Sequence, residues 1–189
     1  KKKFHTLTVY ALFISIITVY VIMAMKFPFA YILATYEDLV GEWAQFYFFL
    51  LALIISVRIA FSSPAYRFFF TLLSLACLYV VLEEISWGQR IFGWESPNYF
   101  KSQNLQGETN LHNIITGPYS TSIKAAVTYI LAGGLVAYGL VYPLAMRSGW
   151  RFAMWLDAKD LASPPMYLWS FFCTAAYLEL KNCQIPGEP

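Results

Sequence analysis

Two adjacent glutamates and a nearby arginine follow directly after an apolar run of the chain. Residues 83–90 read EEISWGQR and come after FFFTLLSLACLYVVL. A carboxylate inside the hydrocarbon of a bilayer costs at least about 2–3 kcal/mol unless it is paired, protonated or in a wet cavity. The position of Glu83 and Glu84 therefore indicates partner groups or a functional site around them.

Distance along the chain supports this placement. Residues 68–82 are 15 residues long, which is about 22 Å of helix, whereas the hydrocarbon core is about 30 Å thick. We expect Glu83 and Glu84 within the outer leaflet or at its edge. On a continuing helix the two carboxylates point about 100° apart, so one can face a site while the other meets a structural partner. Gly88 is the expected helix break, and it would let Arg90 reach back.

The segment after these residues offers further polar groups. The sequence ESPNYF predicts a short helix with Ser96 as its N-cap. Residues 108–115, ETNLHNII, predict an amphipathic helix that carries Glu108 and His112 one turn apart on one side. We therefore expect residues 86–120 to form a re-entrant or interfacial lid over the outer ends of the spans.

These polar residues make up one candidate site. Glu42 and Gln45 begin another apolar segment on the same side, so they can join it. The candidate catalytic residues are Glu83, Glu84, Arg90, Glu108 and His112, with Gln89, Gln106, Asn110 and Asn113 as polar support.

A catalytic interpretation assigns roles to these side chains. Glu84, Glu108 and His112 are of the types that bind one divalent metal ion with an activated water. The remaining glutamate would act as general base, with its pKa raised by desolvation and by its charged neighbour. Arg90 would hold an anionic group of the substrate.

Two other interpretations need no catalysis. In a structural network, Arg90 neutralises a glutamate and tethers the lid, and His112 is a hydrogen-bonding residue. In an accessory or transport role, the ionisable groups mark an ion path, or the chain packs against larger membrane subunits.

The composition of the chain is typical of a membrane protein. Of 189 residues, 59% are hydrophobic and 13% are charged, whereas a soluble domain carries roughly 25% charged residues. A net charge of +2 does not indicate a nucleic-acid-binding surface. The three cysteines form neither a disulfide framework nor a metal motif. The partners expected are membrane lipids and other membrane subunits.

Five apolar segments could position the site. A spanning helix needs about 20 mostly apolar residues, and proline- or glycine-containing breaks separate the candidates. The first segment is longer than the apolar core of a signal peptide and lacks a small-residue cleavage site, so we interpret it as an anchor. The expected spans are residues 6–25, 39–60, 66–85, 122–145 and 166–180.

The loop charges give this bundle an orientation. Eight of the 13 basic residues fall on one side and nine of the 11 acids on the other. The positive-inside rule places the basic side, with the N-terminus, in the cytoplasm. The sequence thus predicts an all-α, polytopic transmembrane bundle, one integral membrane domain over residues 1–189, in a bacterial inner membrane.

Two resemblances add to this prediction. EEISWGQRIFGWESP followed by QGETNLHN resembles a motif pair of bacterial multi-pass membrane proteins, over residues 83–113; this implies membrane residence and no particular activity. Glu83 and Glu84 are also similar to the glutamate pair of CAAX-type membrane proteases, but five residues rather than three separate Glu84 from Arg90. That likeness implies only the chemistry of glutamates used inside a membrane.

The functional prediction combines these points. We expect a membrane-embedded hydrolase or transferase that acts on a lipid, a lipid-linked molecule or a peptide. One form of this hypothesis includes a divalent metal ion that assists the reaction. The alternative is a non-catalytic accessory or structural subunit of a larger membrane complex.

Overall fold

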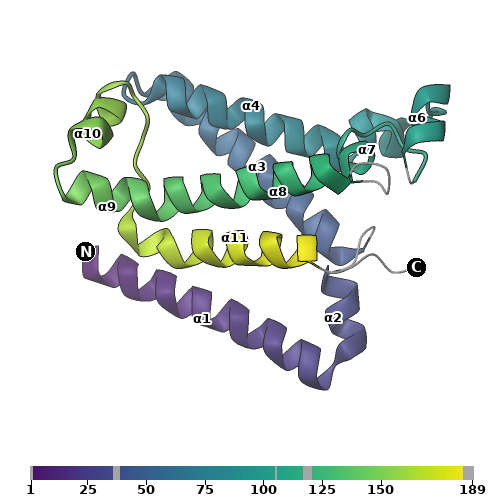
Figure 1. Cartoon of the computed structure of the whole chain (residues 1–189), viewed down its shortest axis with the longest axis horizontal. Coiled ribbons are helices and arrows are strands. Elements are labelled where there is room, and N and C mark those ends of the chain that lie inside the picture. Colours follow the sequence, from purple (N-terminus) through teal and green to yellow (C-terminus); the bar gives the residue numbers. More distant parts are fainter. Residues whose placement is uncertain (1, 36–38, 105, 117–120, 185–189) are drawn as a thin grey trace. The chain divides into compact units, whose positions relative to one another are not determined.

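The computed structural model of the chain is helical, as the composition predicts. It describes residues 2–35, 39–104, 106–116 and 121–184, and no strand occurs in these ranges. The helices, most of which are labelled in Figure 1, fall into two compact units. Residues 36–126 form the unit with the candidate site, and residues 1–35 with 127–189 form the other.

A helical hairpin is the frame of the site-bearing unit. Helix α3, Val40–Ser62, packs along α4, Arg67–Glu84. The turn between them ends at Tyr66, which has a left-handed backbone at φ 59°. Near this turn the buried hydroxyl oxygens of Ser74 and Ser56 lie 3.0 Å apart, within hydrogen-bond distance. Such a hydrogen bond between two apolar helices helps to fix their register.

The chain bends sharply where α4 ends. The short helix Ser86–Gly88 and helix α5, Gln89–Phe92, follow at an angle of 62° to α4. Ser86, Trp87 and Gly88 have φ values of 48°, 54° and 94°. Positive φ is uncommon for residues other than glycine. The helix break that we expect at Gly88 therefore begins two residues earlier, at Ser86.

Residues 85–104 and 106–116, which we call the cap, contain two more short helices. Helix α6 is Asn98–Gln103, with Pro97 rather than Ser96 at its N-cap position. Helix α7 is His112–Thr116. The prediction of one helix over residues 108–115 is wrong, because Glu108 lies in an irregular segment before α7.

The second unit is assembled from the N-terminal helices and the C-terminal third of the chain. Gly139 lies so close to Phe172 that an added Cβ would stand 2.0 Å from its ring. Pro143 follows a π-helical turn, which accommodates the absence of the backbone N–H donor at this proline.

The elements of this second unit are α1 (Lys2–Lys26), α2 (Pro28–Thr35), the later part of α8 (Thr121–Val136), η2 (Ala137–Val141), α9 (Tyr142–Arg147), α10 (Arg151–Ala158), η3 (Met166–Leu168) and α11 (Trp169–Gln184).

Three helices of the described residues are long and apolar enough to cross a membrane. They are His5–Lys26, Val40–Ser62 and Ser122–Arg147. The bent pair Arg67–Glu84 and Ser86–Phe92 makes a fourth when it is counted as one span. The three matching expected segments are thus confirmed as apolar helices of spanning length, while the count of five is not confirmed, since α11 has 16 residues.

Candidate functional site

Arg90 joins three separate parts of the site-bearing unit. Its Nη1 atom lies 2.7 Å from Oε1 of Glu42, at the start of α3. Its Nε and Nη2 atoms donate to Glu108 at 3.1–3.2 Å. The Arg90 side chain is 18% exposed, and a partly buried guanidinium that binds two carboxylates gives strong, directional charge-assisted hydrogen bonds. Arg90 therefore ties the cap to α3.

Glu108 accepts further hydrogen bonds from buried groups. The Ser86 hydroxyl donates to its Oε2 atom at 2.5 Å, and Nδ2 of Asn110 lies 3.3 Å from the same oxygen. Ser86 and Asn110 are almost completely buried. The unusual backbone of Ser86 points its hydroxyl at Glu108, so the bend after α4 and the irregular segment are held together at this carboxylate.

Glu83 is the most deeply buried carboxylate of the site. Its Oε1 atom accepts the indole N–H of Trp87 at 2.6 Å. Its Oε2 atom accepts the backbone N–H groups of Leu111 and His112, both at 2.8 Å. The first N–H groups of a helix have no partner within the helix, and a negative charge there is favourable. Glu83 therefore fixes the start of α7 and, with it, the position of His112.

A second layer of neutral side chains supports these carboxylates. Oε1 of Gln89 accepts the hydroxyl of Ser96 at 3.0 Å and the backbone N–H of Thr109 at 2.8 Å. Nδ2 of Asn104 donates to the side-chain oxygen of Asn110 at 2.7 Å. Buried polar groups that are satisfied in this way stiffen a structure. The cap is thus an ordered polar unit and more than a connecting loop.

Glu84 occupies a different environment from its neighbour Glu83. It is half-buried, and its Oε1 atom accepts Nε2 of Gln45, on α3, at 2.6 Å. It also interacts electrostatically with Glu42, His112 and Arg90. Adjacent positions at the end of α4 thus send one carboxylate into the cap and the other toward α3.

His112 lies between the buried network and the surface. Its Nδ1 atom is 3.6 Å from Oε2 of Glu83, and its side chain is 46% exposed. An imidazole nitrogen can donate or accept a hydrogen bond. His112 and Glu84 are two half-buried side chains of the site that lie within electrostatic range of each other.

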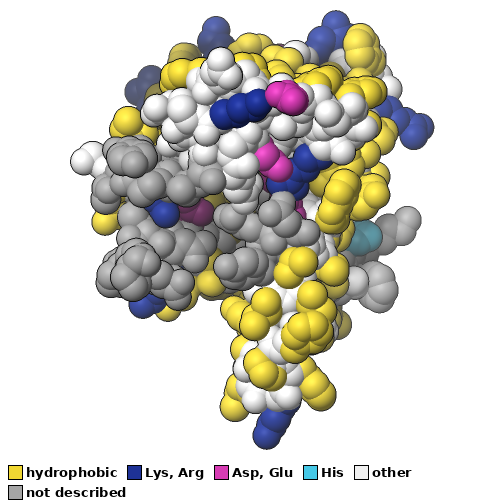
Figure 2. All heavy atoms as spheres, turned by 90° about the vertical axis from the view of Figure 1, so that its right-hand side faces the viewer, with side chains coloured by type: hydrophobic (Ala, Val, Ile, Leu, Met, Phe, Trp, Pro, Cys, Tyr) yellow, Lys and Arg dark blue, Asp and Glu magenta, His cyan; other side chains and the backbone are white. Residues whose placement is uncertain are grey.

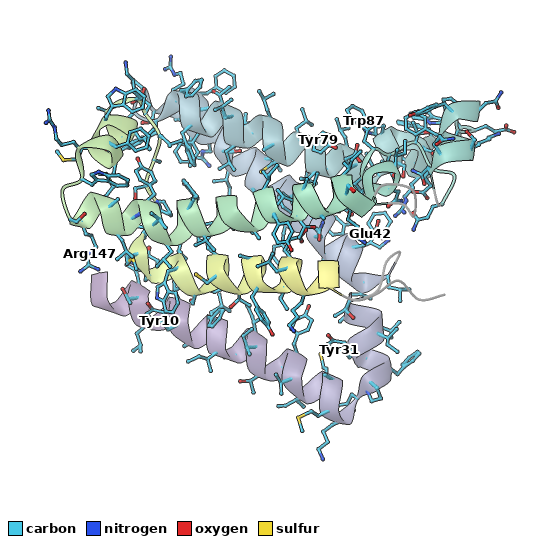
Figure 3. All side chains as sticks on the ribbon, viewed as in Figure 1. Tyr10, Tyr31, Glu42, Tyr79, Trp87 and Arg147 are labelled. Atoms are coloured by element: carbon cyan, nitrogen blue, oxygen red, sulfur yellow. The ribbon has the colours of Figure 1, made fainter. Side chains whose placement is uncertain are left out.

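The outer edge of the cap carries apolar rings and an exposed ion pair. Phe92 and Trp94 stack with their centroids 5.6 Å apart. Lys101 binds Glu95 at 2.8 Å, and this ammonium group holds the pKa of the Glu95 carboxyl below its usual range. Acidic and basic side chains lie next to one another on the face in Figure 2, and Figure 3 places Trp87 just beyond the end of α4. Aromatic rings beside charges suit a membrane–water interface.

The predicted metal ligands have separate partners. Glu84 binds Gln45, Glu108 binds Arg90, and His112 adjoins Glu83. No group of three His, Cys, Asp or Glu residues in the described part of the chain is arranged to hold a metal ion. The metal site on Glu84, Glu108 and His112 stays a prediction from the sequence.

The structure brings all five candidate residues into one end of this unit. Glu42 and Gln45 join them, as their position in the sequence indicates. The one-turn spacing of Glu108 and His112 on a shared helix is wrong. Ser86 was missed, because nothing in the sequence signals that a serine adopts a left-handed backbone.

No protein-family model, curated protein or solved structure matches the chain. The resemblance of residues 83–113 to a motif pair of bacterial membrane proteins stays a prediction.

Proposed function

We propose that the chain is a five-span protein of a bacterial inner membrane whose N-terminus is cytoplasmic and whose cap faces the outer leaflet. The apolar helices and the distribution of basic loops support this arrangement. The bent pair α4–α5 would be the third span and α11 the fifth. Aromatic rings at the edge of the cap fit a position at the membrane surface.

In this setting we infer a membrane-embedded hydrolase or transferase that acts on a lipid, lipid-linked or peptide substrate. The observation that carries this proposal is the different use of two adjacent carboxylates. Glu83 is buried and binds three donors that shape the cap. Glu84 is half-buried, is oriented by Gln45 and interacts with His112. A structural glutamate thus positions the loop that carries a histidine within electrostatic range of a second glutamate.

The reaction that these groups suit is acyl or phosphoryl transfer. The Glu84 carboxylate takes a proton from a water molecule or a substrate hydroxyl, and the oxygen attacks the carbonyl carbon or phosphorus of an ester. The bond to the leaving oxygen breaks, and protonated His112 gives that oxygen a proton. The proton on Glu84 then returns to His112 through solvent, which restores both groups.

Turnover of envelope lipids by the purified full chain tests this proposal. The protein would be incubated in detergent with a bacterial envelope lipid extract, and the species that change would be identified by mass spectrometry. We expect the wild type to convert at least one ester-containing species, while Glu84→Gln and His112→Gln convert it at least about tenfold more slowly. Conversion at wild-type rates by Glu84→Gln would contradict the proposed base.

The second candidate function is a non-catalytic accessory subunit. The mutual pairing of Arg90 with Glu42 and Glu108 favours it, because such a network can serve only to hold the cap. This function predicts a folded wild type that converts no species of the extract. It also predicts that variants of Glu84 and His112 behave like the wild type.

A further inference from the structure

A cavity of about 300 Å³ lies at the opposite end of the α3–α4 hairpin from the cap. Figure 1 shows the α3–α4 turn at the far end of the two helices from α6 and α7. The volume is at the lower end of the range for small-molecule sites, about 300–1,000 Å³. The lining residues are Val57, Ala60, Phe61, Arg67, Thr71, Ser74 and Leu75.

The wall of this cavity is apolar although it contains two hydroxyl residues. The Thr71 hydroxyl donates to the backbone oxygen of Arg67 at 2.8 Å, and the Ser74 hydroxyl donates to that of Phe70 at 2.7 Å. Hydroxyls that bond within their own helix offer little to a ligand. The cavity therefore presents carbon surface to an occupant, and Arg67 is the one charged residue of its lining.

The charge at this end of the hairpin is entirely positive. Arg58 and Arg67 are its charged residues, and no Asp or Glu occurs between positions 43 and 82. Arg67 is exposed and contributes to the cavity lining. A guanidinium beside an apolar cavity suits a ligand with a hydrocarbon chain and an anionic head, since arginine binds phosphate through paired N–H donors.

We propose that this cavity is a binding site for an anionic phospholipid of the bilayer, with an acyl chain in the cavity and the phosphate on Arg67. Phe61, one of the lining residues, is 84% exposed, so this side of the cavity is accessible to lipid chains. The predicted orientation places this end at the cytoplasmic leaflet, whose anionic lipids attract basic groups by about 1 kcal/mol per charge.

Native mass spectrometry of the full chain, released from micelles with equal amounts of phosphatidylglycerol and phosphatidylcholine of the same acyl chains, tests the proposal. We expect the wild type to retain phosphatidylglycerol preferentially. Arg67→Gln should weaken its retention about fivefold. Arg58→Gln removes the same charge from α3 without altering the lining, and should change retention by less than about twofold.

A second variant tests the acyl-chain half of the site. Leu75 lines the cavity but is 57% exposed, so Leu75→Trp should fill space without disturbing the hairpin. We expect it to reduce the retention of both lipids. Equal retention of the two lipids by the wild type would overturn the proposal, as would equal effects of Arg67→Gln and Arg58→Gln, which would indicate only a general attraction to positive charge.

Discussion

The Oε2 atom of Glu83 accepts the backbone N–H of His112 at 2.8 Å, which links the end of α4 to the first residue of α7. The same oxygen accepts the N–H of Leu111, and the other carboxylate oxygen accepts the Trp87 indole. One buried side chain therefore sets the positions of two segments that are about 28 residues apart along the chain.

Glu83→Gln should destabilise the protein. The amide has one acceptor oxygen, so its NH₂ group must face either the indole N–H or the two backbone N–H groups. An unsatisfied buried donor costs about 1–3 kcal/mol, and each kcal/mol lowers the melting temperature of a chain of this size by about 2–4 °C. Thermal unfolding in detergent measures the change.

The matched control for this variant is Glu95→Gln, which makes the same exchange at an exposed glutamate. Its melting temperature should stay within about 1 °C of the wild type, since exposed ion pairs contribute little. Equal effects of the two variants would show that Glu83 does not hold the cap.

Arg90→Lys should loosen the cap while the hairpin stays folded. A lysine carries the charge but lacks the planar fork that reaches Glu42 and Glu108 together. We expect faster hydrogen–deuterium exchange at residues 106–112 and unchanged exchange in the middle of α3. An unchanged exchange rate at residues 106–112 would contradict the bridging role of Arg90.

The strength of the bridge between Arg90 and Glu42 can be measured separately. A double-mutant cycle of Arg90→Gln and Glu42→Gln should give a coupling free energy of about 1–2 kcal/mol, since the two side chains are in direct contact. Additive effects on the free energy of unfolding would mean that the pair contributes nothing beyond its separate residues.

Gly88→Ala should be more destabilising than Gly93→Ala. Both glycines have positive φ, at 94° and 68°, so alanine introduces backbone strain at both sites. A Cβ at Gly88 would also lie 3.0 Å from the Trp94 ring, whereas nothing lies within 4 Å of one at Gly93. We expect a difference of about 1 kcal/mol in the free energy of unfolding.

The sequence was sufficient to predict three of the apolar helices and the end of the site-bearing unit where the polar residues gather. Helical periodicity places Glu83 and Glu84 in different directions, and the structure directs Glu83 to the cap and Glu84 to Gln45. The turn between α3 and α4 brings Glu42 to the same end as these glutamates. The directions of the two glutamates and the position of Glu42 both follow from the geometry of helices, which the local sequence determines.

The cap could not be predicted in detail, because contacts distant in the sequence determine its backbone. Glu108 lies outside a helix because its carboxylate accepts hydrogen bonds from Arg90 and Ser86, which a helical backbone at this position would not allow. Ser96 does not cap α6, and its hydroxyl donates to Gln89 instead. Local sequence propensity does not reveal either of these distant contacts.

We propose that Glu83 holds the cap while Glu84 performs chemistry, and the Glu84→Gln variant tests this division of roles most directly. The measurement compares its melting temperature and its turnover of the envelope lipid extract with those of the wild type. We expect a melting temperature within about 2 °C of the wild type and a rate at least about tenfold lower. A variant that unfolds as readily as Glu83→Gln, or that turns over lipid at the wild-type rate, would contradict it.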